Sequence, residues 1–318
     1  MKLQTKIDIK KSTSTISYSD KVLFMGSCFA NEVGSIMKNL RFDVFVNPFG
    51  VLYNPASIAE SLERLTSGTH FENEDFIKCD DIYKSLSHSS DFAAMSQDEI
   101  KSQINRQLDE ASLHFKQSQW IVLSFGTRWI YRLCSSGKVV ANCQKLPQDR
   151  FSRDPLDIDD VVKLLSPLIA QNPNKNWILT VSPVRHWKDG AHGNQLSKAV
   201  LLLAIEKLQK LHENVHYFPA YEILLDELRD YRFYSEDMLH PSEQAVNHIW
   251  NIFSEIYMDL PSRDFMKVVS RLNSMDGHRP FFPNSNSYMI FDKERKELEK
   301  VMGEKLEYFR SLSSYNNK

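Results

Sequence analysis

The sequence lacks most of the features that mark membrane, secreted and metal-binding proteins. Among its 318 residues, no apolar run approaches the ~20 residues that a membrane-spanning helix needs. Residues 1–8 are polar and lack the apolar segment of a secretory signal. Four cysteines are present, and no two of them form a C-x-x-C pair: they are Cys28, Cys79, Cys134 and Cys143. We therefore expect a cytoplasmic protein with reduced thiols, no membrane partner, no metal and no cofactor.

An excess of charge of one sign is also missing. The chain has 39 Lys and Arg against 41 Asp and Glu, and its net charge is -2. Both signs are mixed along the sequence without a basic stripe, so we expect no nucleic-acid partner. The hydrophobic share of 42% and the charged share of 25% are ordinary for a globular protein. The length allows one large domain, or one domain with an appendage.

Apolar runs alternate with helical patterns along most of the chain, which predicts an α/β fold with a parallel sheet. The pattern predicts strands at 22–25, 42–46, 120–125, 177–181 and 215–218. It predicts helices at 31–40, 97–115, 156–170, 196–211 and 242–258, and one more that begins at Pro55. The segments 129–134 and 138–141 predict a small hairpin.

The pattern changes at two places. Residues 66–96 show no clear period and are rich in Ser, His and Asp, so we expect an irregular insertion near the active-site face. After residue 260 the charges are mixed, and 294–312 predicts a charged helix. We therefore predict an α/β domain over residues 1–260 and a helical extension over 261–318, which packs on that domain or on a partner.

The segment Gly26-Ser27-Cys28-Phe29-Ala30 places a serine at a strand-to-helix turn. In an open α/β sheet, ligands bind beyond the carboxyl ends of the strands. The backbone N–H of Ser27 also lies near a helix N-terminus, where the helix dipole favours an oxyanion. A simple N-cap is the structural alternative. A nucleophilic Cys28 is a second alternative, which ranks below Ser27 because the residue after such a turn more often points into its helix.

Far downstream, Asp237-Met238-Leu239-His240-Pro241 places an acid three residues before a histidine. The proline favours an extended or turn conformation for His240, which suits a general base on a loop. Asp237 can reach the other ring nitrogen and fix its tautomer. Serine, histidine and carboxylate together are the parts of an activated-nucleophile hydrolase.

Further polar groups lie at strand ends. We predict substrate contacts from five of them: Asn47, Asn54, Asn142, Arg185 and His186. A buried ion pair of Arg185 is an equal alternative. His186 and His192 lack the carboxylate spacing of a metal site.

These residues resemble a known family. Gly26-Ser27-Cys28-Phe29-Ala30 spells the motif for which the GSCFA family is named, and that family resembles the SGNH (GDSL-like) hydrolases. Further blocks that look like the family's span residues 22–258: Asn47-Pro48-Phe49-Gly50, Tyr53-Asn54-Pro55, Gly126-Thr127, Val140-Ala141-Asn142-Cys143, Thr180 to Asp189, Phe218 to Glu222 and Asp226 to His240. The resemblance implies a three-layer α/β/α, flavodoxin-like fold with a parallel sheet of about five strands.

By the same resemblance, Ser27 is the nucleophile, His240 the base and Asp237 the residue that orients it. The oxyanion hole would use the backbone N–H groups of Ser27 and Gly50. Those hydrolases usually add an asparagine after the third strand, where this chain reads Gly126-Thr127-Arg128-Trp129. The hydroxyl of Thr127 is our predicted substitute, with Asn54 and Asn142 as alternatives.

The leading hypothesis is a serine hydrolase that removes acetyl or short acyl groups from a carbohydrate or a related small molecule. Two alternatives remain. The same triad could transfer the acyl group to an acceptor alcohol, or the chain could be a non-catalytic glycan-binding protein on a hydrolase scaffold.

Overall fold

Five parallel strands form the central sheet, as the alternating pattern predicts. The computed structural model describes the backbone of residues 5–316 and the side chains of residues 5–312. The sheet order is β11-β10-β6-β1-β2, and its strands are β1 (Lys21–Gly26), β2 (Asp43–Val46), β6 (Trp120–Phe125), β10 (Asn176–Val181) and β11 (Val215–Phe218). From β1 the chain first adds β2 on one side and then returns to add β6 on the other. This switch of direction opens a crevice at the carboxyl ends of β1 and β6.

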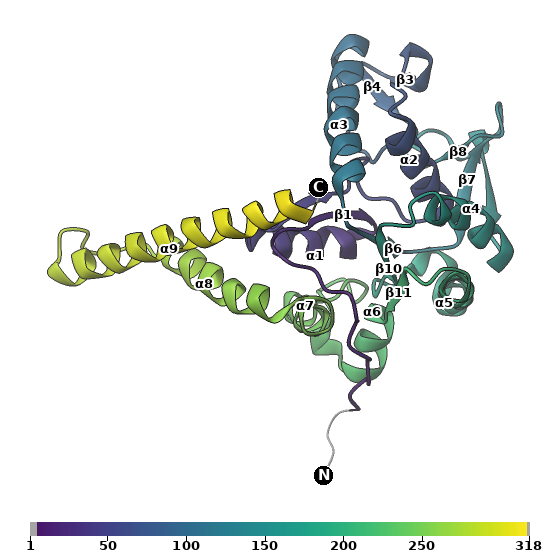
Figure 1. Cartoon of the computed structure of the whole chain (residues 1–318). Helices are drawn as coiled ribbons and strands as arrows, with labels where there is room; N and C mark the ends of the chain where they lie inside the picture. Colours follow the sequence, from purple (N-terminus) through teal and green to yellow (C-terminus); the bar gives the residue numbers. More distant parts are fainter. Residues whose placement is uncertain (1–4, 317–318) are drawn as a thin grey trace.

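Helices cover both faces of this sheet, and the predicted three-layer α/β/α class is confirmed (Figure 1). They are α1 (Cys28–Asn39), α2 (Pro55–Ser67), α3 (Gln97–Gln117), α4 (Ile158–Ala170), α5 (Gly190–Leu211), α6 (Ala220–Glu222), α7 (Glu243–Tyr257), α8 (Leu260–Asp276) and α9 (Asn286–Asn316). A π-helical turn, Ile223–Glu227, follows α6.

Alternation along the strands divides the apolar side chains between two cores. Leu23 of β1 faces the core formed with α2, α3, α4 and α5, whereas its neighbour Phe24 faces the core formed with α1 and α7. Successive side chains of a strand point to opposite faces, so a strand covered on both faces becomes apolar throughout. This is why the continuous apolar runs of the sequence predict the sheet correctly.

Two small antiparallel sheets stand outside the central one. The insertion predicted as irregular contains β3 (Phe76–Cys79), β4 (Ile82–Ser85) and β5 (Ala93–Ala94), paired in the order β3-β4-β5. The predicted hairpin, β7 (Trp129–Leu133) and β8 (Val139–Val140), gains a third strand, β9 (Phe151–Pro155). The expectation of an irregular 66–96 segment is therefore wrong, because strands this short show too little periodicity to predict.

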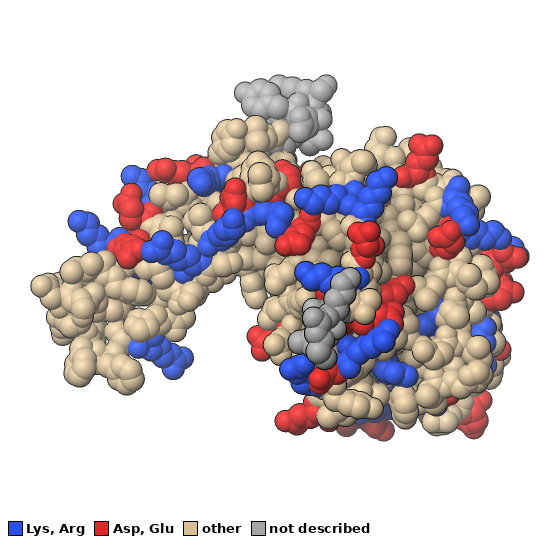
Figure 2. Space-filling model, turned by 90° about the horizontal axis from the view of Figure 1, so that it is seen from below, with Lys and Arg blue, Asp and Glu red and all other residues tan. Residues whose placement is uncertain are grey.

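The last two helices run side by side and project from the body as an arm (Figure 1). Near the body, Phe265 and Phe309 pack against Tyr18, which joins α8 and α9 to the core on the α1 side. Figure 2 shows Lys and Arg mixed with Asp and Glu over the face seen there, and few charges at the outer end of the arm. The exposed side chains of Phe281 and Phe282 lie in the loop between the two helices.

No helix in the described part of the chain is both long and apolar enough to cross a membrane.

We expect Gly26→Ala to prevent stable folding. Gly26 has φ +131°, and a Cβ there would lie 2.1 Å from the carbonyl oxygen of Ser124. The carbonyl belongs to the backbone of a central strand and cannot move away from the new Cβ. We therefore expect the substitution to lower the free energy of unfolding by about 3 kcal/mol or more. Gly68→Ala is the matched control, since Gly68 also has positive φ (+65°) but an added Cβ would meet no atom within 4 Å, and it should cost only about 1 kcal/mol. Equal losses in urea unfolding would contradict the tight β1–β6 contact.

Candidate active site

The turn between β1 and α1 lies at the switch point of the sheet. Ser27 is the N-cap residue of α1 and is only 2% exposed. Its N–H donates to the carbonyl oxygen of Ser124 at 3.0 Å, and its Oγ lies 2.8 Å from Ser124 Oγ. Ser27 therefore occupies the predicted strand-to-helix turn, but both its polar groups contact the buried end of β6.

Cys28, the first residue of α1, is more accessible than Ser27. Its Sγ lies 3.7 Å from the hydroxyl of Tyr53. Within residues 5–316, the backbone N–H of Cys28 makes no hydrogen bond, as is usual for the first residue of a helix. Free N–H groups at a helix N-terminus are suited to bind an oxyanion.

Asp237 and His240 form the predicted carboxylate–imidazole pair. Oδ1 of Asp237 accepts hydrogen bonds from the N–H groups of Leu239 and His240 at 2.9 and 3.0 Å, and its Oδ2 lies 2.6 Å from His240 Nδ1. The two backbone N–H groups, followed by the imidazole, lower the pKa of Asp237 to about 2. An ionised carboxylate can only accept, so Nδ1 carries a proton and the neutral ring presents Nε2 as its basic atom.

The β1–α1 turn and His240 line one cavity of about 390 Å³. Its walls include Ser27, Cys28 and His240, together with Tyr53 and residues between Ser182 and Lys188. No hydrogen bond joins His240 to either Ser27 or Cys28 within the described residues. Apo active sites often have looser contacts than the complex with substrate, and the shared cavity leaves room for a substrate between these groups.

Arg185 and His186, two of the predicted substrate-contact residues, line the same cavity. The N–H of Arg185 donates to the carbonyl oxygen of Leu239 at 3.1 Å, which ties the end of β10 to the turn that carries His240. Nδ1 of His186 lies 3.4 Å from Asp189. Burial lowers the pKa of His186, and the carboxylate of Asp189 opposes that shift.

The predicted oxyanion hole is not assembled in this structure. The N–H of Gly50 donates to Asn47 within a turn at 2.8 Å, and the N–H of Ser27 is engaged by Ser124. The buried hydroxyl of Thr127 lies 3.1 Å from Ser197 Oγ. Since all three donors already have partners, we do not assign the oxyanion hole to them.

The three asparagines predicted to contact substrate have structural partners instead. Asn47 accepts from Gly26 N–H at 2.8 Å, and Asn54 caps α2 by accepting from Ser57 N–H at 2.8 Å. Asn142 accepts from the N–H of Gln144 at 2.7 Å. None of the three is among the cavity-lining residues of the described chain. Polar residues at strand ends fit turn and cap roles as well as substrate contacts, so the sequence pattern alone does not separate these roles.

Tyr53, Trp187 and Lys188 are cavity residues that the sequence analysis did not select. Trp187 is 50% exposed, an unusual position for so large an apolar side chain. Both Tyr53 and Trp187 belong to segments that follow a strand of the sheet, and both stand in blocks that resemble the family, but neither signal gives a residue its role. Burial, followed by the neighbouring Cys28, raises the pKa of Tyr53, so its hydroxyl stays protonated.

Among the described residues, no group of three or more His, Cys, Asp or Glu side chains could hold a metal ion.

The fold and the site together define an α/β protein with a carboxylate–histidine pair, and with a turn that carries Ser27 and Cys28 at the switch point of its parallel sheet. Residues 21–253 match the model of the GSCFA family. This match covers well over half of the chain, so the protein belongs to the GSCFA family. A search of the curated proteins finds no match.

Lys198 of α5 is buried and contacts Ser182, a residue of the cavity wall. Its ammonium group, 1% exposed, donates to the carbonyl oxygen of Ser182 at 2.8 Å. Burial and the nearby charge of Arg185 lower the pKa of Lys198 to about 7 from its usual 10.5. Between these values the unfolded chain holds a proton that the folded chain has lost, so stability rises with pH in this window.

We expect Lys198→Met to remove this rise. The wild-type free energy of unfolding should gain up to about 1.4 kcal/mol per pH unit from this one group above pH 7, and the variant should not. Urea unfolding at pH 7, 8 and 9 measures the two slopes, which are independent of any constant loss from the unpaired Ser182 carbonyl. The exposed Lys210→Met serves as control. Parallel pH slopes for wild type and Lys198→Met would show that Lys198 is charged in both states.

Proposed function

We propose that this protein hydrolyses carboxylic esters through a covalent acyl-enzyme, with His240 as the base and Asp237 as the residue that orients it. The observation that carries the proposal is the Asp237–His240 pair, whose histidine lines the same cavity as the β1–α1 turn. The likeness of the sequence to the SGNH hydrolases supports the same chemistry. Short acyl esters of a carbohydrate or a related small molecule are the proposed substrates.

In this reaction His240 Nε2 takes the proton of the nucleophile, which attacks the ester carbonyl carbon. The tetrahedral oxyanion collapses, the C–O bond breaks, and the leaving alcohol takes the proton from His240. Water then attacks the acyl-enzyme, again giving its proton to His240, and the acid and the free nucleophile are released. The ionised Asp237 stabilises the imidazolium that forms in both halves of the reaction.

Two residues compete for the role of nucleophile. Ser27 is the residue that the sequence predicts, yet its hydroxyl bonds with Ser124 in the interior. Cys28 lies on the accessible side of the turn, and its free N–H is next to its own sulfur, where an oxyanion would form. The geometry therefore favours Cys28, because its side chain is not directed into the helix as the sequence analysis expected. The proposed function needs only one of the two.

Acyl transfer to a second alcohol is the other candidate function. A second cavity of about 580 Å³ adjoins the first and shares Arg185, Trp187 and Leu239 with it, so an acceptor has a place to bind. Hydrolysis and transfer differ only in the molecule that attacks the acyl-enzyme.

We expect His240→Ala to lower kcat/KM for 4-nitrophenyl acetate by about 10²- to 10⁴-fold, the usual contribution of a general base. His70→Ala is the matched control, because His70 forms a similarly exposed pair with Asp109 at 2.8 Å outside the cavity. Steady-state rates and melting curves are measured for both. If neither wild type nor variant turns over any aryl acetate or acetylated sugar, the enzyme proposal fails and a glycan-binding protein is the better hypothesis.

The nucleophile is identified by comparing Cys28→Ala with Ser27→Ala. If Cys28 reacts, Cys28→Ala should abolish the acyl-enzyme that intact-mass spectrometry detects after rapid quenching, while Ser27→Ala should keep it. Cys134→Ala, which removes an exposed thiol of the β7 hairpin region, controls for non-specific acylation. An acyl-enzyme that survives in Cys28→Ala and disappears in Ser27→Ala would return the role to Ser27.

A further inference from the structure

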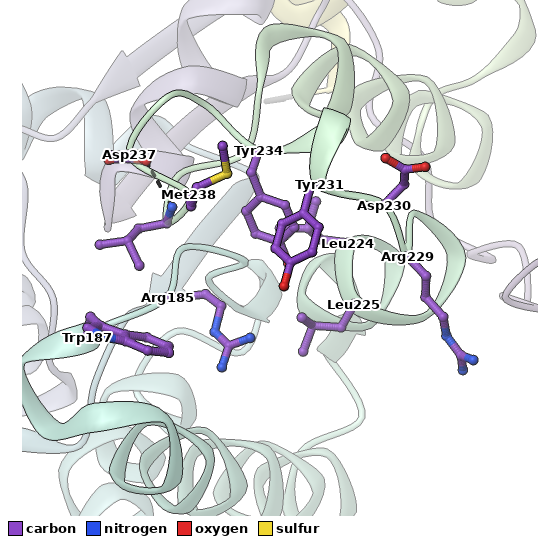
Figure 3. Close-up of a pocket in the computed structure, with 11 residues that line it drawn as sticks. Arg185, Trp187, Leu224, Leu225, Arg229, Asp230, Tyr231, Tyr234, Asp237 and Met238 are labelled. Atoms are coloured by element: carbon purple, nitrogen blue, oxygen red, sulfur yellow. Dashed lines mark hydrogen bonds between the residues drawn. The ribbon is translucent and has the colours of Figure 1, made fainter.

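The second cavity is lined by charged side chains together with aromatic and apolar ones. It lies between the segment after β10 and the segment after α6, and Arg185, Trp187, Leu225, Tyr231 and Tyr234 line it (Figure 3). Figure 3 shows the Arg185 guanidinium directed into the space between Trp187 and Leu225. Arg185 and Trp187 also line the cavity that contains His240, so the two cavities are adjacent.

Arg185 lacks the ion-pair partner that arginines near it have. Arg153 pairs with Asp189 at 2.6 Å, and Arg229 pairs with Asp226 at 3.2 Å. Arg185 forms no ion pair with any carboxylate of residues 5–312, and its Nε is buried without a hydrogen bond. Its guanidinium carbon lies 5.3 Å from the centre of the Trp187 ring, which holds the group in place through a cation–π contact.

The acidic groups of this cavity have partners of their own. Asp237 bonds with His240, and Asp230 accepts from the N–H of Arg232. Neither is therefore in position to neutralise Arg185.

The buried Lys198 is a second basic group in this region. Its ammonium contacts a carbonyl oxygen but no carboxylate among the side chains described, and Arg185 is the charge that acts on it. Two basic groups thus share one region without a counter-ion. An arginine without a counter-ion is unfavourable in a partly buried site, so an anion bound at Arg185 would stabilise it. Below about pH 7, where Lys198 keeps its proton, the anion would also relieve the repulsion between the two basic groups.

We propose that this cavity binds an anionic group, a phosphate or a carboxylate, on the alcohol part of the ester substrate, with Arg185 as its main donor. The proposal rests on the proposed function for the ester, while the anion site itself can be tested without turnover. The planar guanidinium can donate two parallel hydrogen bonds to either group. The exposed rings of Trp187 and Tyr231 offer apolar surface to the body that carries the charge.

Binding is tested on the His240→Ala protein, so that no substrate is consumed. Inorganic phosphate and glucuronate are the two anionic probes, and glucose is the neutral one. We expect at least one anion to raise the melting temperature by about 2–3 °C near ten times its Kd, and glucose to have no effect. If only phosphate raises the melting temperature, the site binds a phosphorylated alcohol. If only glucuronate does, the site binds a uronic acid.

Adding Arg185→Gln should weaken binding of that anion by about 10- to 100-fold, the value of a hydrogen bond to a charged group. Arg185→Lys keeps the charge and should restore part of the affinity, which also covers a glutamine variant that folds poorly. Arg132→Gln, at an exposed arginine of β7, is the control and should bind as the parent does. No response to either anion, or an unchanged response in Arg185→Gln, would overturn the proposal.

Rates of ester hydrolysis distinguish a failure of the anion site from a failure of the proposed esterase function. In the protein with His240 intact, Arg185→Gln should lower kcat/KM at least about 10-fold more for an anionic acetylated sugar than for 4-nitrophenyl acetate. Anion binding without hydrolysis of any ester would refute the esterase and leave the anion site standing. If both esters are hydrolysed and Arg185→Gln has no effect on either rate, the esterase proposal stands and the anion site is refuted.

Discussion

The close contact between Gly26 and Ser124 is the constraint on which the site depends. Because Gly26 has no side chain, the ends of β1 and β6 approach until Ser124 accepts the N–H of Ser27. Gly26 also donates its N–H to the side chain of Asn47 and accepts the N–H of Leu52 at 2.9 Å, so three segments meet at one residue. These bonds set the direction in which α1 leaves the sheet, and they hold Ser27 against Ser124 at the wall of the cavity that Cys28 also lines.

The other half of the site is built in the same way, from backbone contacts between loops. The turn that carries Asp237 and His240 is joined to the end of β10 through the N–H of Arg185, and Lys198 holds the Ser182 carbonyl beneath it. The Asp237–His240 pair and the unpaired arginine are therefore joined by a backbone hydrogen bond. A ligand that binds Arg185 would act directly on the segment that fixes the base.

Much of the fold could be predicted from the sequence, and the candidate site only in part. The strands are apolar on both faces, and the Asp237–His240 spacing is local, so both leave a clear pattern. The true start of α5, at Gly190 rather than the predicted Leu196, leaves no such pattern. Gly190 and Gly193 weaken the helical pattern of its first turn. The engagement of the N–H groups of Ser27 and Gly50 follows from register and turn geometry. The identity of a residue does not determine register or turn geometry. The availability of oxyanion donors and the orientation of Cys28 therefore could not be predicted from the sequence.

The two cores of the protein are completed at different points along the chain. All buried members of the core under α2 to α5 lie between Leu23 and Tyr221. The core on the α1 side needs residues from both ends, since Tyr18 stacks on Phe42 and packs against Phe265 and Phe309. During synthesis, the first core can therefore close while the ribosome is still extending the chain, whereas the second closes only after Phe309 has emerged. Until then the contacts that Tyr18 makes with Phe309 are missing, and the core on the α1 side is incomplete.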